Sequence, residues 1–249
     1  MSIAQTLIPE WIAPMAKNAK QTIKKNRAQI EYSLMFVGSI YALIVMVGSA
    51  ILYYFIQEPF TVFSHWFSNM GVGITGWAFN QGLQGTAILY SAMIIIFSLR
   101  FHATKKSTKL MSFLGMVFGI IAVTGIFILT TNNMVEGRIL HLIGAYMYFV
   151  ATPFFTTFET IALALEGSSS KQHWIISLLL VFLSTSMAPL MSIIGNSIGI
   201  PLAEVLGSMD PHFGIVRLIE WASVLFFFIW IFFMGLQYRN YVRNVIKNE

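Results

Sequence analysis

Cysteine is absent from the sequence. Its absence excludes disulfide bonds, thiolate metal sites and cysteine nucleophiles. It does not identify a compartment, because a membrane protein without disulfides can face either side. Redox chemistry by thiols is therefore excluded for this chain.

Charged residues are also scarce. They make up 10% of the chain, against about a quarter in an average soluble domain, while 57% of the residues are hydrophobic. The formal net charge of +5 could suggest a nucleic-acid partner, but the Lys and Arg residues flank apolar stretches instead of forming a basic domain of their own. The composition predicts an integral membrane protein and no nucleic-acid partner.

Six apolar stretches are long enough to cross a bilayer, which takes roughly 20 residues of helix. No connection between them is long enough for a second globular domain. The sequence therefore predicts an all-α polytopic membrane protein, a bundle of about six transmembrane helices with short interfacial helices. The stretches are 32–57, 76–99, 110–131, 139–165, 174–195 and 215–238.

The basic residues predict the direction of threading. Cytoplasmic loops of membrane proteins carry an excess of Lys and Arg. With six spans, thirteen of the fifteen basic residues fall on one side, and only Arg138 and Arg217 fall on the other. Both termini are therefore expected in the cytoplasm, with a basic N-terminal segment at 1–31, a transmembrane domain at 32–238 and a basic tail at 239–249.

The N-terminal segment and two of the loops contain patterns typical of short helices. Ile12, Met15, Ala16, Ala19 and Ile23 recur at helical spacing before the first span, which fits either a basic interfacial helix or a partly ordered positive tail. The aromatic residues of the 58–75 loop predict a short helix at headgroup level. In the last outer loop, Pro201 begins a second surface helix that Gly207 ends. Asp210 and Pro211 then read as the N-cap and first position of the final helix.

Polar residues gather near the outer ends of the second, fourth and sixth spans. A polar side chain inside a membrane is costly and usually faces the bundle interior. All three helices would direct their N-termini outward, where the helix dipole favours an anion. Two readings stay open, a site for a lipid headgroup or small anion, and structural hydrogen bonds between helices, with Arg217 and Glu220 neutralising each other. The candidate ligand-binding residues are Asn80, Gln84, His141, Arg217 and Glu220.

Glu159 lies in the inner half of the fourth span and has no basic partner nearby in sequence. Such a carboxylate could be a proton relay or an ion ligand. It could equally reach the inner headgroups or pair with a neighbouring helix. Glu159 is therefore a possible proton or ion site, and a transporter or proton pathway is the less favoured functional alternative.

Catalytic and metal motifs are lacking. The five histidines show no HxxxH or HExxH spacing, and no GxSxG, Walker or GxGxxG signature occurs. These absences favour a non-enzymatic role and predict neither a metal nor a cofactor.

Several segments resemble a known family. They are FSHWFSNMG from Phe63, AFNQGL from Ala78, HLIGA from His141 and GIVRL from Gly214. The chain over residues 32–238 resembles the six-span prokaryotic membrane family catalogued as domain of unknown function 998. That family is itself distantly similar to DRAM-type and GPI-anchor-remodelling membrane proteins. The family's acidic residue before the last-span arginine is replaced here by Val216, so no role is carried over to Arg217.

The resemblance implies a prokaryotic plasma membrane and makes lipid a plausible partner, but lends no reaction. The leading hypothesis is a protein that binds or handles a lipid headgroup or small anion at the outer polar cluster. The alternative is a non-catalytic accessory subunit of a larger membrane complex, with other membrane subunits or a second copy of the chain as partners.

Overall fold

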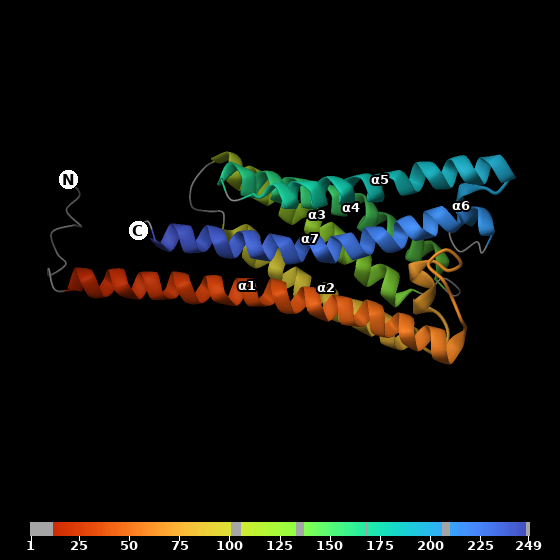
Figure 1. Ribbon diagram of the computed structural model, residues 1–249, viewed down its shortest axis with the longest axis horizontal. Helices are drawn as coiled ribbons and strands as arrows, with labels where there is room; N and C mark the ends of the chain where they lie inside the picture. Colours follow the sequence, from red (N-terminus) through yellow and green to blue (C-terminus); the bar gives the residue numbers. More distant parts are fainter. Residues whose placement is uncertain (1–11, 101–105, 133–136, 168, 206–209, 248–249) are drawn as a thin grey trace.

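The computed structural model describes residues 12–100, 106–132, 137–167, 169–205 and 210–247. Over these residues the fold consists of helices and loops, with six long helices packed side by side (Figure 1). α1 begins and α7 ends at the same end of the bundle, so the chain crosses its length six times. The long helices are α1 (Ile12–Leu52), α2 (Gly76–Arg100), α3 (Lys106–Thr131), α4 (Arg138–Leu165), α5 (Lys171–Ile198) and α7 (Gly214–Lys247).

The predicted all-α membrane bundle is confirmed. Five segments are long and apolar enough to cross a bilayer. The remaining long helix, α2, has 25 residues, and Asn80, Gln81 and Gln84 make its first half more polar. At 1.5 Å of rise per residue α2 is about 37 Å long, which exceeds the hydrocarbon core of about 30 Å. The five apolar segments are Tyr32–Gln57, Lys106–Thr131, Arg138–Leu165, Lys171–Ile198 and Pro211–Arg239.

The sequence left open whether the segment before the first span is a basic interfacial helix or a partly ordered tail, and the structure continues it as helix into the span. α1 is one helix of 41 residues, from Ile12 through the first span to Leu52, and a π-helical turn (Tyr53–Gln57) ends it. The sequence offers no reason for a break, because Pro14 lies within the first turn, where proline is tolerated, and the first glycine is Gly38. The basic segment thus continues the span. Residues 1–11 lie outside the described part of the chain.

The structure agrees with the predictions made for the loop between the fifth and sixth spans. α6 (Leu202–Val205) follows Pro201, as expected, although Gly207 lies outside the described residues. Asp210 caps the short 3-10 helix η4 (Pro211–Phe213) by accepting a hydrogen bond from the backbone N–H of His212. α7 follows directly, so Arg217 and Glu220 lie inside the helix, as the Asp-Pro pattern predicts.

α3 and α4 pack closest through two glycines. A Cβ atom built on Gly144 would lie 2.6 Å from the backbone nitrogen of Leu129 and 2.7 Å from the carbonyl oxygen of Gly125. A Cβ on Gly125 would lie 2.6 Å from the carbonyl oxygen of Gly144. Only glycine permits this contact between backbones, the usual role of small residues between transmembrane helices. The contact sets the position of His141, one turn before Gly144.

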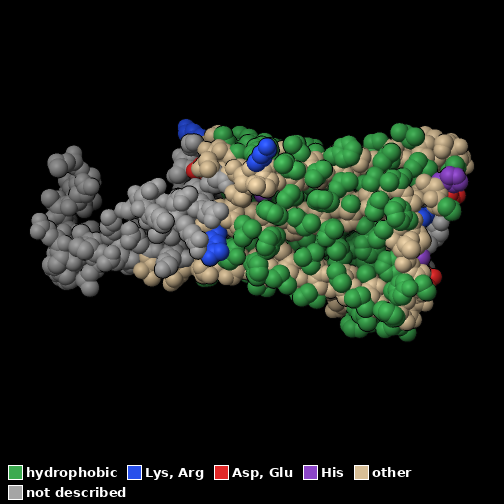
Figure 2. Space-filling model, viewed as in Figure 1, with side chains coloured by type: hydrophobic (Ala, Val, Ile, Leu, Met, Phe, Trp, Pro, Cys, Tyr) green, Lys and Arg blue, Asp and Glu red, His purple; other side chains and the backbone are tan. Residues whose placement is uncertain are grey.

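The bundle flank is apolar. In the face shown in Figure 2, hydrophobic side chains cover the sides of the described bundle, and charged side chains lie toward its two ends. Large side chains such as Phe55, Ile74, Ile139 and Phe182 are more than half exposed. Such a surface is suited to lipid tails and would aggregate in water.

Replacing Gly144 by leucine is expected to destabilise the bundle by about 1–3 kcal/mol, because the backbones of α3 and α4 must separate. The measurement is the Tm of the purified protein in detergent. Gly48→Leu is the matched control, since nothing lies within 4 Å of a Cβ at Gly48. An equal Tm for the two variants would contradict the close packing of α3 on α4.

Candidate functional site

The loop between α1 and α2 folds into the end of the bundle. Its 3-10 helix η3 (Phe67–Gly71) matches the short helix expected in this loop, and two of the loop's aromatic side chains are buried in the bundle. The expected position at headgroup level stays a prediction. Trp66 is 1% exposed, Phe67 6% and Met70 2%. Phe67 packs edge-on against Phe79 of α2 and Trp221 of α7, with ring centroids 5.0 and 5.1 Å apart. The Trp66–Met70 part of the loop is thus largely in the core.

Three neighbouring residues of α7 hold the backbone of this loop. Arg217 Nη1 donates to the carbonyl oxygen of Phe63 at 2.7 Å. Trp221 Nε1 donates to the carbonyl oxygen of His65 at 3.1 Å. Glu220 Oε2 accepts from the backbone N–H of Phe67 at 2.8 Å, and the N–H of Ser68 donates to the same side chain. One turn of α7 therefore satisfies the irregular backbone that the loop brings into the bundle.

Arg217 is a structural anchor in this geometry. Its side chain is 1% exposed, and Nη2 donates to the carbonyl oxygen of Asp210 at 2.7 Å, which ties the start of α7 to the loop. The guanidinium also lies over the ring of Trp66, 5.6 Å from its centroid. Arg217 thus bonds to the carbonyl oxygens of Phe63 and Asp210, whereas Glu220 accepts from the N–H groups of Phe67 and Ser68.

The side-chain amides of Asn80 and Gln84 in α2 have different surroundings. Asn80 Nδ2 donates to the carbonyl oxygen of Gly71, at the end of η3. A Cβ on Gly71 would lie 2.7 Å from Asn80 Oδ1, so the loop meets α2 without room for a side chain. Gln84, one turn later, is partly exposed. Asn80 therefore holds the loop from the α2 side.

His141, at the start of α4, is buried and oriented by α3. Its Nδ1 lies 2.8 Å from the carbonyl oxygen of Leu129 and 2.7 Å from that of Asn132. Because both neighbours only accept, Nδ1 carries a proton, and Nε2 is the acceptor of the neutral ring. The last turn of α3 therefore selects the tautomer of His141.

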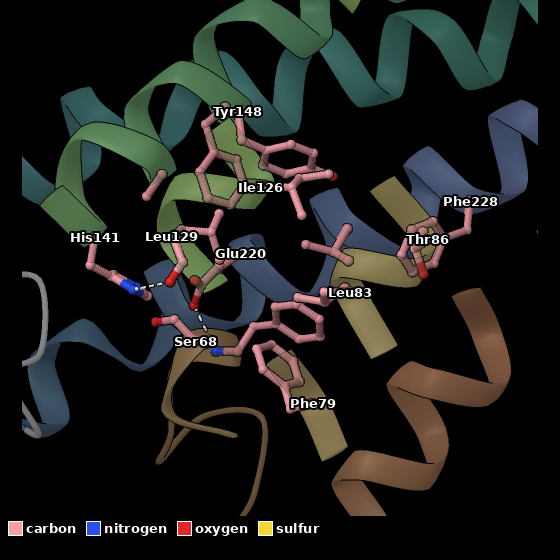
Figure 3. Close-up of a pocket in the computed structure, with 14 residues that line it drawn as sticks. Ser68, Phe79, Leu83, Thr86, Ile126, Leu129, His141, Tyr148, Glu220 and Phe228 are labelled. Carbon is pink, nitrogen blue, oxygen red and sulfur yellow. Dashed lines mark hydrogen bonds between the residues drawn. The ribbon is translucent and has the colours of Figure 1, made fainter. Parts of the chain in front are cut away.

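Two adjoining cavities lie beneath the loop, each of about 40 Å³. The first lies among η3, α2, α3, α4 and α7, and Figure 3 shows His141, Glu220 and Ser68 at one end with Leu83, Thr86 and Phe228 at the other. A water molecule needs a cavity volume of roughly 10–15 Å³. Each cavity is therefore large enough for a group of a few heavy atoms. Its walls are mainly apolar.

The second cavity extends from the same polar residues toward the bundle surface between α4 and α5. Its lining includes Tyr146 and Val150, which are 39% and 57% exposed on the flank. Ser68, His141, Ala145, Phe149 and Glu220 line both cavities. A polar site inside the bundle is thus adjacent to the lipid-facing surface.

The five predicted ligand-binding residues are only partly brought together. His141 and Glu220 line the cavities, Asn80 and Arg217 hold the loop above them, and Gln84 lines neither cavity. Ser68 and Tyr148 line a cavity but were not among the predicted residues. Nothing in the local pattern distinguishes Ser68 from other loop serines, whereas Tyr148 lies two helical turns after His141 and could have been placed on its face.

The candidate proton or ion site, Glu159, lies apart from these cavities. It is fully buried in α4 and packs against α3, where a Cβ on Gly115 would lie 2.5 Å from its Oε1. It therefore does not reach the headgroups. Its neighbour Thr160 belongs to a buried network in which the hydroxyl of Ser177 lies 2.7 Å from Thr160 Oγ1 and 2.7 Å from Trp230 Nε1. These contacts join α4, α5 and α7.

A second polar group lies where α1 enters the loop. Tyr53 donates its hydroxyl to Glu58 Oε1 at 2.7 Å, and His65 Nε2 lies 3.1 Å from the same oxygen. On the other side of the ring, His65 Nδ1 lies 2.8 Å from Ser64 Oγ. Hydrogen bonds from Tyr53 and then from His65 lower the pKa of Glu58 from its ordinary value. Glu58 is therefore ionised at neutral pH.

Removing the Arg217 guanidinium is expected to release the loop. Arg217→Ala loses two charge-assisted hydrogen bonds, each worth about 1.5–3 kcal/mol. The Asp210 carbonyl oxygen keeps the backbone N–H of Phe213 as a donor, while the Phe63 carbonyl oxygen loses its Arg217 donor. We expect a lower Tm and faster proteolysis between residues 58 and 75, mapped by mass spectrometry. Lys171→Ala removes an exposed cation at the other end and serves as control. Unchanged cleavage in Arg217→Ala would show that the guanidinium does not hold the loop.

Comparison with known proteins adds no relative, since no family model, curated protein or solved structure matches the chain. The resemblance to the six-span family of unknown function stays a prediction.

Proposed function

We propose that the protein binds a membrane lipid or a similar amphipathic molecule through the cleft between α4 and α5. Its polar group would enter the cavities toward Ser68, His141 and Glu220. One observation carries this proposal: polar residues of three separate elements, η3, α4 and α7, line both cavities, and the second cavity reaches the exposed flank at Tyr146 and Val150.

The chemistry of the lining favours a ligand that donates hydrogen bonds. Glu220 contributes a carboxylate, and the tautomer of His141 leaves Nε2 as an acceptor. Arg217, the cation expected to attract an anion, lines neither cavity and donates to the carbonyl oxygens of Phe63 and Asp210. An ammonium or hydroxyl group therefore fits this lining better than the phosphate that the sequence suggested.

The apolar part of the ligand has a path along the flank. Phe149 of α4 and Met187 of α5 line the second cavity. Ala145 and Ala188 also line it, and their small side chains leave its entrance open. A cavity of about 40 Å³ admits only the polar group, so the acyl chains would lie outside, against the lipid-facing surface. Binding is thus lateral, from within the bilayer.

Filling the cavities should abolish binding without removing a hydrogen bond. Ala145 lines both cavities, so Ala145→Leu is expected to reduce co-purified lipid at least tenfold in native mass spectrometry of protein extracted gently from membranes. Glu220→Gln should weaken binding of lipids with an amine headgroup most. Gly48→Leu adds the same side chain where nothing lies within 4 Å. Equal lipid retention in Ala145→Leu and Gly48→Leu would refute the proposal.

We further propose that the end carrying the 58–75 loop faces outward and that both termini are cytoplasmic, since the basic residues favour this direction. The cysteine-free chain allows a clean test with single cysteines. In intact cells, an impermeant maleimide should label Thr61→Cys, and should label Lys109→Cys and Lys171→Cys only after permeabilisation. All three positions are exposed. Labelling of Thr61→Cys and Lys109→Cys from the same side would show that α2 does not cross.

A further inference from the structure

The polar group around His65 has the arrangement of an activated serine. Ser64 Oγ lies 2.8 Å from His65 Nδ1, and Glu58 Oε1 lies 3.1 Å from Nε2 on the opposite side of the ring. Nucleophile, base and orienting carboxylate in this order are the geometric signature of nucleophilic catalysis by a hydroxyl group. The order along the chain differs from that in familiar hydrolases, but roles follow geometry rather than sequence position.

The proton positions follow from the partners. Glu58 is an ionised acceptor, so the ring hydrogen of neutral His65 sits on Nε2 and leaves a lone pair on Nδ1. The single hydroxyl proton of Ser64 can point to Nδ1 at 2.8 Å or to the carbonyl oxygen of Thr61 at 3.0 Å. The shorter path leads to the base.

Ser64 Oγ accepts two hydrogen bonds from Thr61. One lone pair accepts the backbone N–H of Thr61 at 2.8 Å. The Thr61 hydroxyl donates to the other lone pair at the longer distance of 3.1 Å, and rotation of this hydroxyl would free that lone pair for attack. The Ser64 side chain is partly exposed, which leaves it within reach of a substrate.

The constellation is held rigidly. Arg217 and Trp221 bind the carbonyl oxygens of Phe63 and His65, the residues on which Ser64 and the base depend for position. Glu58 is held by the Tyr53 hydroxyl at 2.7 Å, and the ring of His65 packs edge-on against Tyr53 and Phe60. Side chains fixed in this way need little reorganisation before reaction.

We propose that Ser64, His65 and Glu58 form a nucleophilic site that accepts an acyl group from a carboxylic ester. The Ser64 oxygen forms a bond to the ester carbonyl carbon as its proton passes to His65 Nδ1. The ester C–O bond then breaks, and His65 returns the proton to the leaving alcohol. Water reverses the sequence, releasing a carboxylic acid and restoring Ser64. No oxidant or cofactor is needed.

This site is separate from the cavities beneath the loop, because neither Ser64 nor His65 lines them. The inference therefore stands without the proposed lipid binding. Its surroundings favour an ester at the membrane surface, since Phe63, beside Ser64, is 53% exposed at the end of an apolar flank.

The test uses the full chain in detergent with a fluorophosphonate probe and tandem mass spectrometry. Attack forms a bond from Ser64 Oγ to phosphorus, and fluoride leaves. We expect Ser64 to be modified, with heat-denatured protein unlabelled. His65→Gln should slow labelling about 100-fold, the usual contribution of a general base. Ser197 is an exposed serine whose hydroxyl donates to the carbonyl oxygen of Ile194. Ser197→Ala should therefore leave the labelling of Ser64 unchanged.

A second experiment replaces the Ser64 hydroxyl by a thiol and so does not depend on the probe. In Ser64→Cys the chain contains one thiol, and iodoacetamide should alkylate it at least tenfold faster at pH 7 than the thiol of Ser197→Cys, because His65 stabilises the thiolate. Hydrolysis of p-nitrophenyl butyrate should follow the labelling rate across the variants. No labelling of Ser64 in folded protein, or equal alkylation of the two thiols, would show that Ser64 only caps its turn.

Discussion

One turn of α7 holds together the end of the bundle that carries the 58–75 loop. In a bilayer, non-helical backbone is tolerated only where protein groups satisfy its N–H and C=O groups. Arg217, Glu220 and Trp221 do this for the loop between α1 and α2, with contacts to Phe63, Phe67 and His65. A charged pair in this position is costly on its own. Here both side chains bond to backbone groups, which explains how the sequence carries them inside a helix.

That anchoring has consequences on both sides of the loop. Below it, η3 closes the end of the bundle and leaves two small cavities in which His141, Ser68 and Glu220 meet. Above it, the same contacts hold the backbone of Phe63 and His65, so that Ser64, His65 and Glu58 keep their hydrogen bonds at a partly exposed position. The two cavities and the partly exposed group of Ser64, His65 and Glu58 thus depend on one set of α7 residues.

Much of the fold could be predicted because membrane helices are specified locally. Each of the six predicted apolar stretches lies on one of the six long helices, four of them with ends that agree within a few residues, while α1 and α7 extend further into their basic segments. Asp210-Pro211 placed the start of the last helix. The site was less accessible. The sequence marked Arg217 and Glu220 as unusual, but their roles depend on a loop about 150 residues away, and no local pattern shows that Glu220 faces a cavity while Arg217 faces away from it.

The sequence by itself determined that the chain is suited to a membrane, how many long helices it forms and how unevenly its positive charge is distributed. Each of these follows from hydrophobicity or charge summed over a segment. The tertiary structure alone decided that Trp66 and Phe67 of the loop belong to the core and that α1 continues through its basic segment without a break. It alone brought Ser68 to His141 and Glu220. The physical reason is that burial of a loop and the direction of a side chain depend on which helices pack together. In this protein that packing rests on close contacts such as Gly125 with Gly144, which only three dimensions reveal.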